Sequence, residues 1–156
     1  MIYDCFTFFN ELDLLEIRLN ELDHVVDRFV LVEATLTHQG KPKELHYEKN
    51  KERFTQFHHK IVHVVVDTYP SDAGSDAWVY EKHQRNSIIE GLKECSGEDL
   101  IMVSDVDEIP RPEKVLEAAT QSGIRIFRQR MFYYFLNSLN VTVRIGENYA
   151  WNGTVM

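Results

Sequence analysis

The chain has 156 residues, 44% of them hydrophobic and 27% charged, which fits one globular domain large enough to bury a core. Its net charge of −8 argues against nucleic acid and anionic membranes as partners, because no basic stripe is available to neutralise phosphates. No apolar run approaches the roughly 20 residues of a transmembrane helix, and no signal peptide is evident, so we expect a cytoplasmic protein without a transmembrane segment. Cys5 and Cys95 are expected to be free thiols.

The hydrophobic pattern predicts strands and helices in alternation along the chain. Strands are expected at residues 2–6, 28–34, 61–66, 98–104 and 124–128. Helices are expected at residues 12–22, 48–60, 75–94 and 112–122, the first with Asn10 as its N-cap. This alternation is typical of an α/β fold with a doubly wound, mostly parallel, Rossmann-like sheet.

Three carboxylates leave the fourth predicted strand together. The apolar run 100–103 is typical of a buried central strand, and Asp105, Asp107 and Glu108 follow it. Carboxylates this close repel one another unless one is protonated or a cation lies among them. Mg²⁺ or Mn²⁺ is the natural cation for oxygen ligands, and it could in turn hold a diphosphate. The sequence therefore predicts metal-assisted chemistry on a nucleotide.

Other polar side chains follow the ends of the predicted strands, where ligands bind in sheets of this kind. Residues 7–11 follow the first strand, Glu33 ends the second, and Asp67 follows the third. Three histidines, His58, His59 and His63, have no cysteine nearby and are expected on the surface rather than around zinc. The segment 40–42 is expected to form a turn and not a phosphate-binding loop.

The long predicted helix contributes a positive charge on its inward side. Arg85 precedes an apolar stripe made of Ile88, Ile89 and Leu92. A partly buried guanidinium needs an anion, so we expect Arg85 to bind a diphosphate or to pair with a carboxylate, either Asp105 or Glu33.

Several stretches of the chain resemble one known family. They are residues 2–22, residues 29–42, residues 84–86 (Gln-Arg-Asn) and residues 104–110 (Ser-Asp-Val-Asp-Glu-Ile-Pro). They look like glycosyltransferase family 17, which includes the β-1,4-mannosyl-glycoprotein 4-β-N-acetylglucosaminyltransferases. The resemblance implies a GT-A type fold, a UDP-sugar donor (UDP-GlcNAc in the characterised branch), a protein- or lipid-linked glycan acceptor, a Mn²⁺ or Mg²⁺ ion, and inversion at the anomeric carbon.

The resemblance also implies roles for individual residues. Asp107 would be the metal ligand, and Asp105 would contact the ribose, or the metal through water, so both are candidate catalytic residues. Nucleotide-sugar contacts are expected from Asn10, Glu11, Glu33, Arg85, Asn86 and Asp105. Among these, Glu33 would contact the uridine, and Arg85 would add a second positive charge beside the diphosphate.

Structural explanations stay open for some of the same residues. Asn10 is equally well explained as an N-cap, and Glu33 as a cap for a helix or a partner for a lysine. Glu108 is expected to make a structural hydrogen bond in its turn. The aromatic run 132–135 is expected to lie mostly in the core, with one tyrosine available to stack on a sugar.

One departure from the family concerns length. Family members continue well past residue 156, and the missing part typically supplies acceptor contacts and the general base, which is unassigned here. We therefore expect residues 1–156 to form one domain that is the nucleotide-sugar-binding part of a glycosyltransferase. A non-catalytic nucleotide-sugar-binding fragment is the alternative. A haloacid-dehalogenase-like phosphatase is disfavoured, because its Asp-x-Asp motif follows the first strand.

Overall fold

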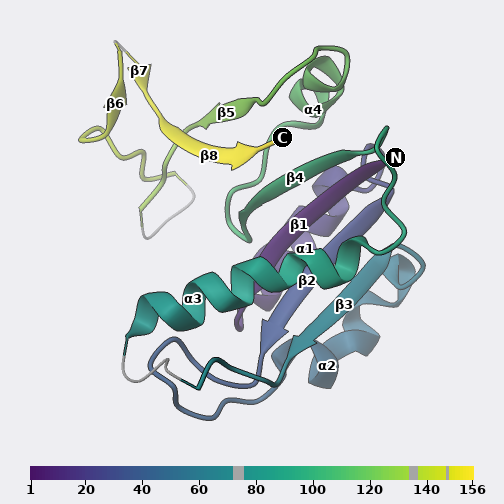
Figure 1. Cartoon of the computed structure of the whole chain (residues 1–156). Helices are drawn as coiled ribbons and strands as arrows, with labels where there is room; N and C mark the ends of the chain where they lie inside the picture. Colours follow the sequence, from purple (N-terminus) through teal and green to yellow (C-terminus); the bar gives the residue numbers. More distant parts are fainter. Residues whose placement is uncertain (72–75, 134–136, 147) are drawn as a thin grey trace.

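The computed structural model describes residues 1–71, 76–133, 137–146 and 148–156. Its main sheet has six strands in the order β3-β2-β1-β4-β8-β5 (Figure 1). The strands are β1 (Ile2–Phe8), β2 (Arg28–Ala34), β3 (Ile61–Val66), β4 (Leu100–Asp105), β5 (Ile126–Gln129) and β8 (Trp151–Val155). Strands β1 to β4 pair in parallel, and β8 pairs antiparallel with β4 and β5. The predicted α/β class with a mostly parallel sheet is confirmed.

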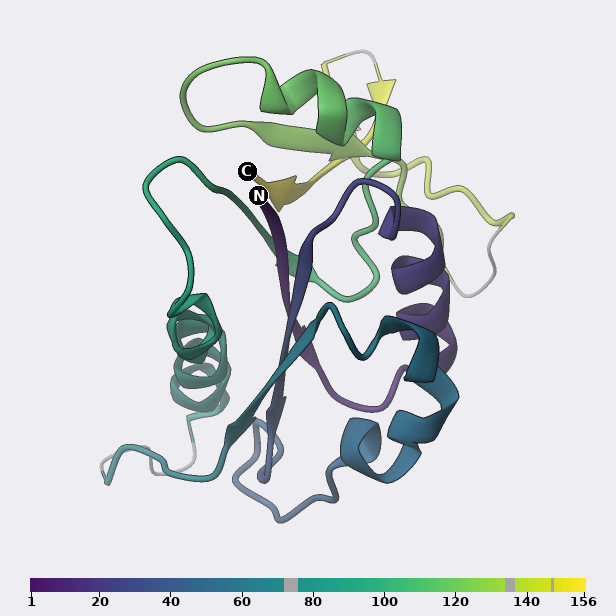
Figure 2. The same cartoon turned by 90° about the vertical axis from the view of Figure 1, so that its right-hand side faces the viewer.

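Helices cover both faces of the parallel part of this sheet (Figure 2). One face carries α1 (Leu12–Leu22), α2 (His46–Asn50) and the 3₁₀ helix η1 (Lys51–Phe57), and the other carries α3 (Ala77–Asn86) and the 3₁₀ helix η2 (Ser87–Leu92). Helix α4 (Pro112–Ala119) lies beside β5, and a small hairpin is formed by β6 (Arg144–Ile145) and β7 (Asn148–Tyr149).

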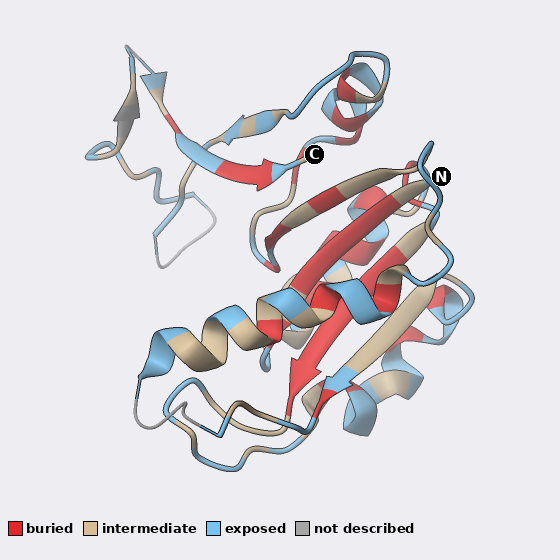
Figure 3. Ribbon diagram, in the orientation of Figure 1, coloured by how far each residue is buried: buried red, intermediate tan, exposed pale blue. Residues whose placement is uncertain are grey.

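Two hydrophobic clusters lie on the opposite faces of the sheet. Phe6, Phe29 and Leu31 belong to the cluster under α1 and α2, whereas Val30 and Val32 belong to the cluster under η2. Successive β2 residues therefore alternate between two buried faces, which explains why the sequence of this strand is almost continuously apolar. Figure 3 shows β1 and β2 as the most deeply buried strands.

The long helix predicted at residues 75–94 is two helices of different pitch. Helix α3 ends at Asn86 and continues as the 3₁₀ helix η2, which has about three residues per turn. With that period, Ile88 and Gly91 share the buried face, and Ile89 turns outward with 66% of its surface exposed. The predicted inward stripe is therefore wrong at Ile89. Gly91 packs so closely on β2 that an added Cβ would lie 2.3 Å from Val30 Cγ1.

Cys5 is buried, Cys95 is half-buried, and both are free thiols, as predicted. Phe132 and Tyr133 are exposed rather than in the core, because they lie outside the main sheet, where Phe132 forms an isolated bridge with Leu139. The other two residues of that aromatic run lie outside the described residues. None of the helices in the described ranges is long and apolar enough to span a membrane.

Candidate functional site

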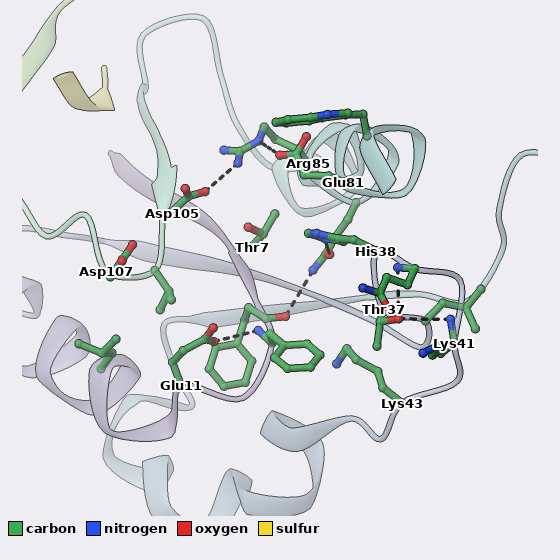
Figure 4. Close-up of a pocket in the computed structure, with 18 residues that line it drawn as sticks. Thr7, Glu11, Thr37, His38, Lys41, Lys43, Glu81, Arg85, Asp105 and Asp107 are labelled. Atoms are coloured by element: carbon green, nitrogen blue, oxygen red, sulfur yellow. Dashed lines mark hydrogen bonds and ion pairs between the residues drawn. The ribbon is translucent and has the colours of Figure 1, made fainter. Parts of the chain in front are cut away.

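A cavity of about 800 Å³ opens at the carboxyl ends of β1, β2 and β4 (Figure 4). Its walls are the end of β1, the loop after β2, one side of α3, and the acidic loop after β4, which we define as residues 105–108. Ligands of open parallel sheets bind at this edge. The cavity collects Glu11, Arg85, Asp105 and Asp107 from the predicted site residues.

The two aspartates of the acidic loop have different surroundings. Arg85 Nη2 donates to Asp105 Oδ1 at 2.7 Å, and Arg85 Nε donates to Glu81 Oε1 at 2.7 Å. Burial lowers the pKa of Arg85, but its hydrogen bonds to Asp105 and Glu81 raise that pKa above its ordinary value. Asp107 is exposed to the cavity and makes no hydrogen bond or ion pair with the part of the chain that the structure describes (Figure 4). The predicted pairing of Arg85 with Asp105 is thus observed.

Glu108 has a structural role in the same loop. Its main-chain N–H donates to Asp105 O at 3.1 Å, and its Oε2 accepts from the Asp105 N–H at 3.1 Å. From β8, Trp151 Nε1 donates to Glu108 Oε1 at 2.7 Å, and Thr154 Oγ1 donates to Glu108 O at 2.8 Å. The predicted structural hydrogen bond of Glu108 is confirmed, and it closes the turn that presents both aspartates.

Asn10 and Glu11 are neighbours in the connection between β1 and α1, but only Glu11 lines the cavity. Glu11 lines the cavity, and its Oε2 accepts from the main-chain N–H groups of Phe9 at 3.1 Å and Asn10 at 3.0 Å. Asn10 is exposed outside the cavity lining. The prediction that Asn10 caps α1 is wrong, because the N-cap position is Glu11 and no side chain caps it.

Glu33 is fully buried on the opposite side of the sheet from α3, and it does not line the cavity. Glu33 and Leu31 are two residues apart on β2, so their side chains point to the same face of the sheet, the face that α2 covers. There Glu33 accepts from the Tyr47 N–H at 3.1 Å, and it lies 3.2 Å from His63 Nε2 and 3.7 Å from Lys43 Nζ. Both structural explanations of Glu33, at a helix start and beside a lysine, match these contacts. His63, half-buried in this way, is not on the surface.

Asn86 also lies outside the cavity. It is exposed at the last position of α3, one residue beyond Arg85, and about 100° further around the helix. The cavity-facing residues of this helix are instead Trp78, Glu81, Gln84 and Arg85.

Sequence reasoning missed two residues that shape the cavity. Gln84 is buried and donates through Nε2 to Val32 O at 2.9 Å and Phe8 O at 3.3 Å, which fixes α3 to the strand ends. The Lys43 side chain is only 6% exposed, lines the cavity and lies 5.0 Å from the centre of the Phe9 ring. Burial lowers the pKa of Lys43. The lysine-rich segment that follows the second strand was the signal in the sequence that could have indicated Lys43.

That segment folds into the turn expected from the sequence. The Thr37 N–H donates to Lys41 O at 2.8 Å, and Gly40 adopts a φ of +70°. Thr37 also accepts the N–H groups of Gly40 through its carbonyl and of Gln39 and Lys41 through its hydroxyl. Because these N–H groups are bonded within the turn, they are not available to cradle a phosphate.

The carboxylates fit a metal that is shared with a ligand. Among the described residues, no group of three or more His, Cys, Asp or Glu side chains could hold a metal ion. Mg²⁺ commonly binds through one or two carboxylates, with water and substrate phosphates completing its coordination. Asp105 and Asp107 face the same cavity, and Asp107 has no partner among the described residues, so this donor set suits such a site.

Fold and cavity together define an α/β protein with a candidate ligand site at the carboxyl edge of a parallel sheet. The family model described as "Glycosyltransferase family 17" matches residues 1–148. The chain belongs to this family, as its sequence motifs predict.

Curated relatives carry one shared name, beta-1,4-mannosyl-glycoprotein 4-beta-N-acetylglucosaminyltransferase. The proteins of Homo sapiens and Rattus norvegicus are each 31% identical to this chain over 113 residues, and that of Mus musculus is 30% identical. Each alignment covers 69% of this chain and 21% of the relative, so the similarity spans about a fifth of those longer proteins. No solved structure matches the chain significantly.

Proposed function

We propose that this chain is the donor-binding part of a metal-dependent, inverting glycosyltransferase of the GT-A type. The observation that carries the proposal is the arrangement of Asp105, Asp107 and Arg85 around one cavity at the carboxyl edge of the parallel sheet. Membership of family 17 and the names of the relatives support a UDP-sugar donor, with N-acetylglucosamine as the sugar, and a glycan acceptor linked to protein or lipid.

Three of the cavity residues have a chemical task in this proposal. Asp107 is the ligand of a Mn²⁺ or Mg²⁺ ion, and Asp105 binds the ribose or a metal-bound water. When bound, the metal supplies Lewis-acid stabilisation of the negative charge that develops on the departing diphosphate. Arg85 is the second positive group beside the same diphosphate, because it lines the cavity together with both aspartates and would exchange its 2.7 Å contact with Asp105 for phosphate oxygens.

The transfer itself is a single displacement. The oxygen of an acceptor hydroxyl forms a bond to the anomeric carbon while the bond from that carbon to the diphosphate oxygen breaks. The electron pair of the broken bond stays with UDP, and the hydroxyl proton passes to a general base. Attack from the side opposite the leaving group inverts the anomeric configuration. The base is left unassigned.

Calorimetric titration with UDP and UDP-GlcNAc tests the donor site. We expect binding in the presence of Mn²⁺ or Mg²⁺, and loss of that binding when a chelator removes the ion. Asp107→Asn keeps the size of the side chain but removes its charge, so it should weaken metal-dependent binding by at least about tenfold, as changes at metal sites commonly do.

The matched control is Asp67→Asn. Asp67 is exposed after β3, at the same edge of the sheet but outside the cavity, so this variant should bind like the wild type. Binding that persists with chelator, or that Asp107→Asn leaves unchanged, contradicts the metal role of Asp107. Absence of UDP binding under every metal condition overturns the proposed function.

A non-catalytic donor-binding fragment is the second candidate, since the residues assigned here serve donor binding and the general base is unassigned. It predicts the same metal-dependent binding. The two candidates separate when release of UDP from bound UDP-GlcNAc is measured with a mannose-containing acceptor present. An enzyme releases UDP in an amount equal to the sugar transferred, whereas a binding fragment releases none.

A further inference from the structure

Arg18 is a fully buried arginine in the middle of α1, and its charge is neutralised inside the core. Its Nε donates to Asp4 Oδ2 at 2.8 Å and its Nη2 to Asp4 Oδ1 at 2.6 Å, a bidentate pair in which both side chains are 0% exposed. Nη2 also donates to Ser104 Oγ at 2.6 Å, and the guanidinium carbon lies 4.5 Å from the centre of the Phe6 ring. Because Asp4 balances its charge, Arg18 contributes little net attraction for an anionic ligand.

The third nitrogen of Arg18 binds the backbone of the acidic loop. Nη1 donates to the carbonyl oxygens of Asp105 at 2.8 Å, Val106 at 3.1 Å and Glu108 at 3.3 Å. Three carbonyls within four residues therefore turn inward to one guanidinium. The side chains of Asp105 and Asp107 line the cavity (Figure 4), whereas Arg18 does not.

We infer that Arg18 is a positioning residue that fixes the backbone of the acidic loop so that Asp105 and Asp107 face the cavity together. The inference rests on the proposed metal-dependent donor site, which it deepens. Metal and diphosphate contacts tolerate displacements of only about 0.5 Å, and a loop that follows a strand end needs external support to reach that accuracy. An arginine suits the task, because its planar group offers five N–H donors in fixed directions.

The role can be tested with a variant that keeps the charge. Arg18→Lys still neutralises Asp4, but an ammonium has three N–H donors on one atom and cannot reproduce six hydrogen bonds in three directions. The matched control is Leu22→Ala, which removes a fully buried side chain of the same helix and touches none of these hydrogen bonds. Both variants are compared with wild type at a temperature where circular dichroism shows all three to be folded.

The first readout needs neither nucleotide nor metal. Hydrogen–deuterium exchange is followed in the segment 103–110, where the N–H groups of Asp105 and Glu108 are bonded within the loop. Arg18→Lys should speed this exchange at least tenfold more than Leu22→Ala does, because Leu22→Ala acts on the segment only through the loss of global stability. The second readout is the Mn²⁺-dependent affinity for UDP, which should fall at least tenfold in Arg18→Lys and stay unchanged in Leu22→Ala.

The outcomes separate the two proposals. If Arg18→Lys is less stable, but its loop exchange and UDP affinity equal those of the control, the positioning role is overturned and Arg18 is a packing residue. If wild type does not bind UDP, the proposed function fails, and the exchange still decides whether Arg18 holds the loop. If Arg18→Lys does not fold, Ser104→Ala replaces it, with faster exchange confined to residues 103–110 as the supporting result and unchanged exchange as the contrary one.

Discussion

Glu33 is buried behind the cavity and does not line it. A fully buried carboxylate is costly unless hydrogen bonds and an opposite charge compensate for lost hydration. Glu33 receives both, from the Tyr47 N–H at the start of α2 and from the ammonium of Lys43 at 3.7 Å. Lys43 lines the cavity and Glu33 does not, so the Glu33 carboxylate contributes to the stability of the fold behind the cavity and not to its lining.

Glu33→Gln should therefore destabilise the fold and leave nucleotide binding nearly intact. The amide keeps an acceptor for the Tyr47 N–H but removes the negative charge beside Lys43, so we expect a loss of about 1–3 kcal/mol in the free energy of unfolding. UDP affinity should change by less than about threefold, because Glu33 does not line the cavity. Loss of a direct ligand contact worth about 1.4 kcal/mol would change the affinity about tenfold. Urea unfolding and calorimetry measure the two quantities.

The control for this prediction is Glu52→Gln, an exposed residue at the start of η1, which should change stability by no more than about 0.5 kcal/mol. A contrary result is a Glu33→Gln variant that is as stable as wild type but no longer binds UDP. That outcome would make Glu33 the uridine contact that the family resemblance implies.

The junction between α3 and η2 determines how closely these two helices pack on the sheet. The Ser87 hydroxyl donates to His83 O at 2.9 Å at the end of α3, and the backbone then tightens into the 3₁₀ helix. The tighter period brings Gly91 onto β2 and β3, where the absence of a side chain allows contact with Val30 and Val64. Gln84 and Arg85, about two turns before Gly91, thereby reach the strand ends.

Gly91→Ala tests this packing. A new Cβ would lie 2.3 Å from Val30 Cγ1 and 3.1 Å from Val64 Cγ2, so η2 must move outward. Overpacking costs about 1–3 kcal/mol, whereas alanine gains about 0.5–1 kcal/mol over glycine in a helix. We expect net destabilisation in urea unfolding, with Ile89→Ala, on the exposed side of η2, close to wild type. Unchanged stability of Gly91→Ala would contradict the close seating of η2 on the sheet.

Regular elements were predictable where one period extends over enough residues. The bounds of α1, β2 and β3 match the prediction, because each is one uninterrupted apolar pattern. The six residues of η2 are too few to distinguish a period of 3.0 from 3.6, so Ile89 was assigned to the wrong face. The two-residue strands β6 and β7 carry no readable pattern.

Site residues were predictable only where the reason for them is local. Asp105 and Asp107 repel each other two residues apart, and Arg85 shares a helix face with apolar neighbours, so sequence alone indicated a site. Arg18 lies 87 residues from Asp105, and Gln84 lies 76 residues from Phe8, so only the folded chain reveals their roles. The predicted uridine contact of Glu33 stays a prediction, but its place outside the cavity was not readable, since a strand buried on both faces has no polar alternation to show which way a side chain points.

At the scale of the whole molecule, the acidic loop is where the two ends of the chain meet. Arg18, from the first helix, binds its carbonyls, while Trp151 and Thr154, from the last strand, bind Glu108. Strand β8 also pairs with β4 at Val103 and Val155. The loop geometry thus depends on contacts between segments far apart in sequence, which favours unfolding of residues 1–156 as one unit.

The two tryptophans of the chain, Trp78 and Trp151, allow this unity to be measured. Trp78→Phe leaves a reporter on β8, and Trp151→Phe leaves one on α3, so each variant follows a different part of the molecule. For a single cooperative domain, the fluorescence and far-ultraviolet circular dichroism transitions in urea should coincide within each variant. Trp151→Phe should have the lower midpoint, because it loses the hydrogen bond to Glu108, worth about 1 kcal/mol. If Trp151 fluorescence in Trp78→Phe changes at lower urea than the circular dichroism does, the antiparallel pair of β5 and β8 unfolds separately. The acidic loop would then lose its β8 contacts while its Arg18 contacts persist.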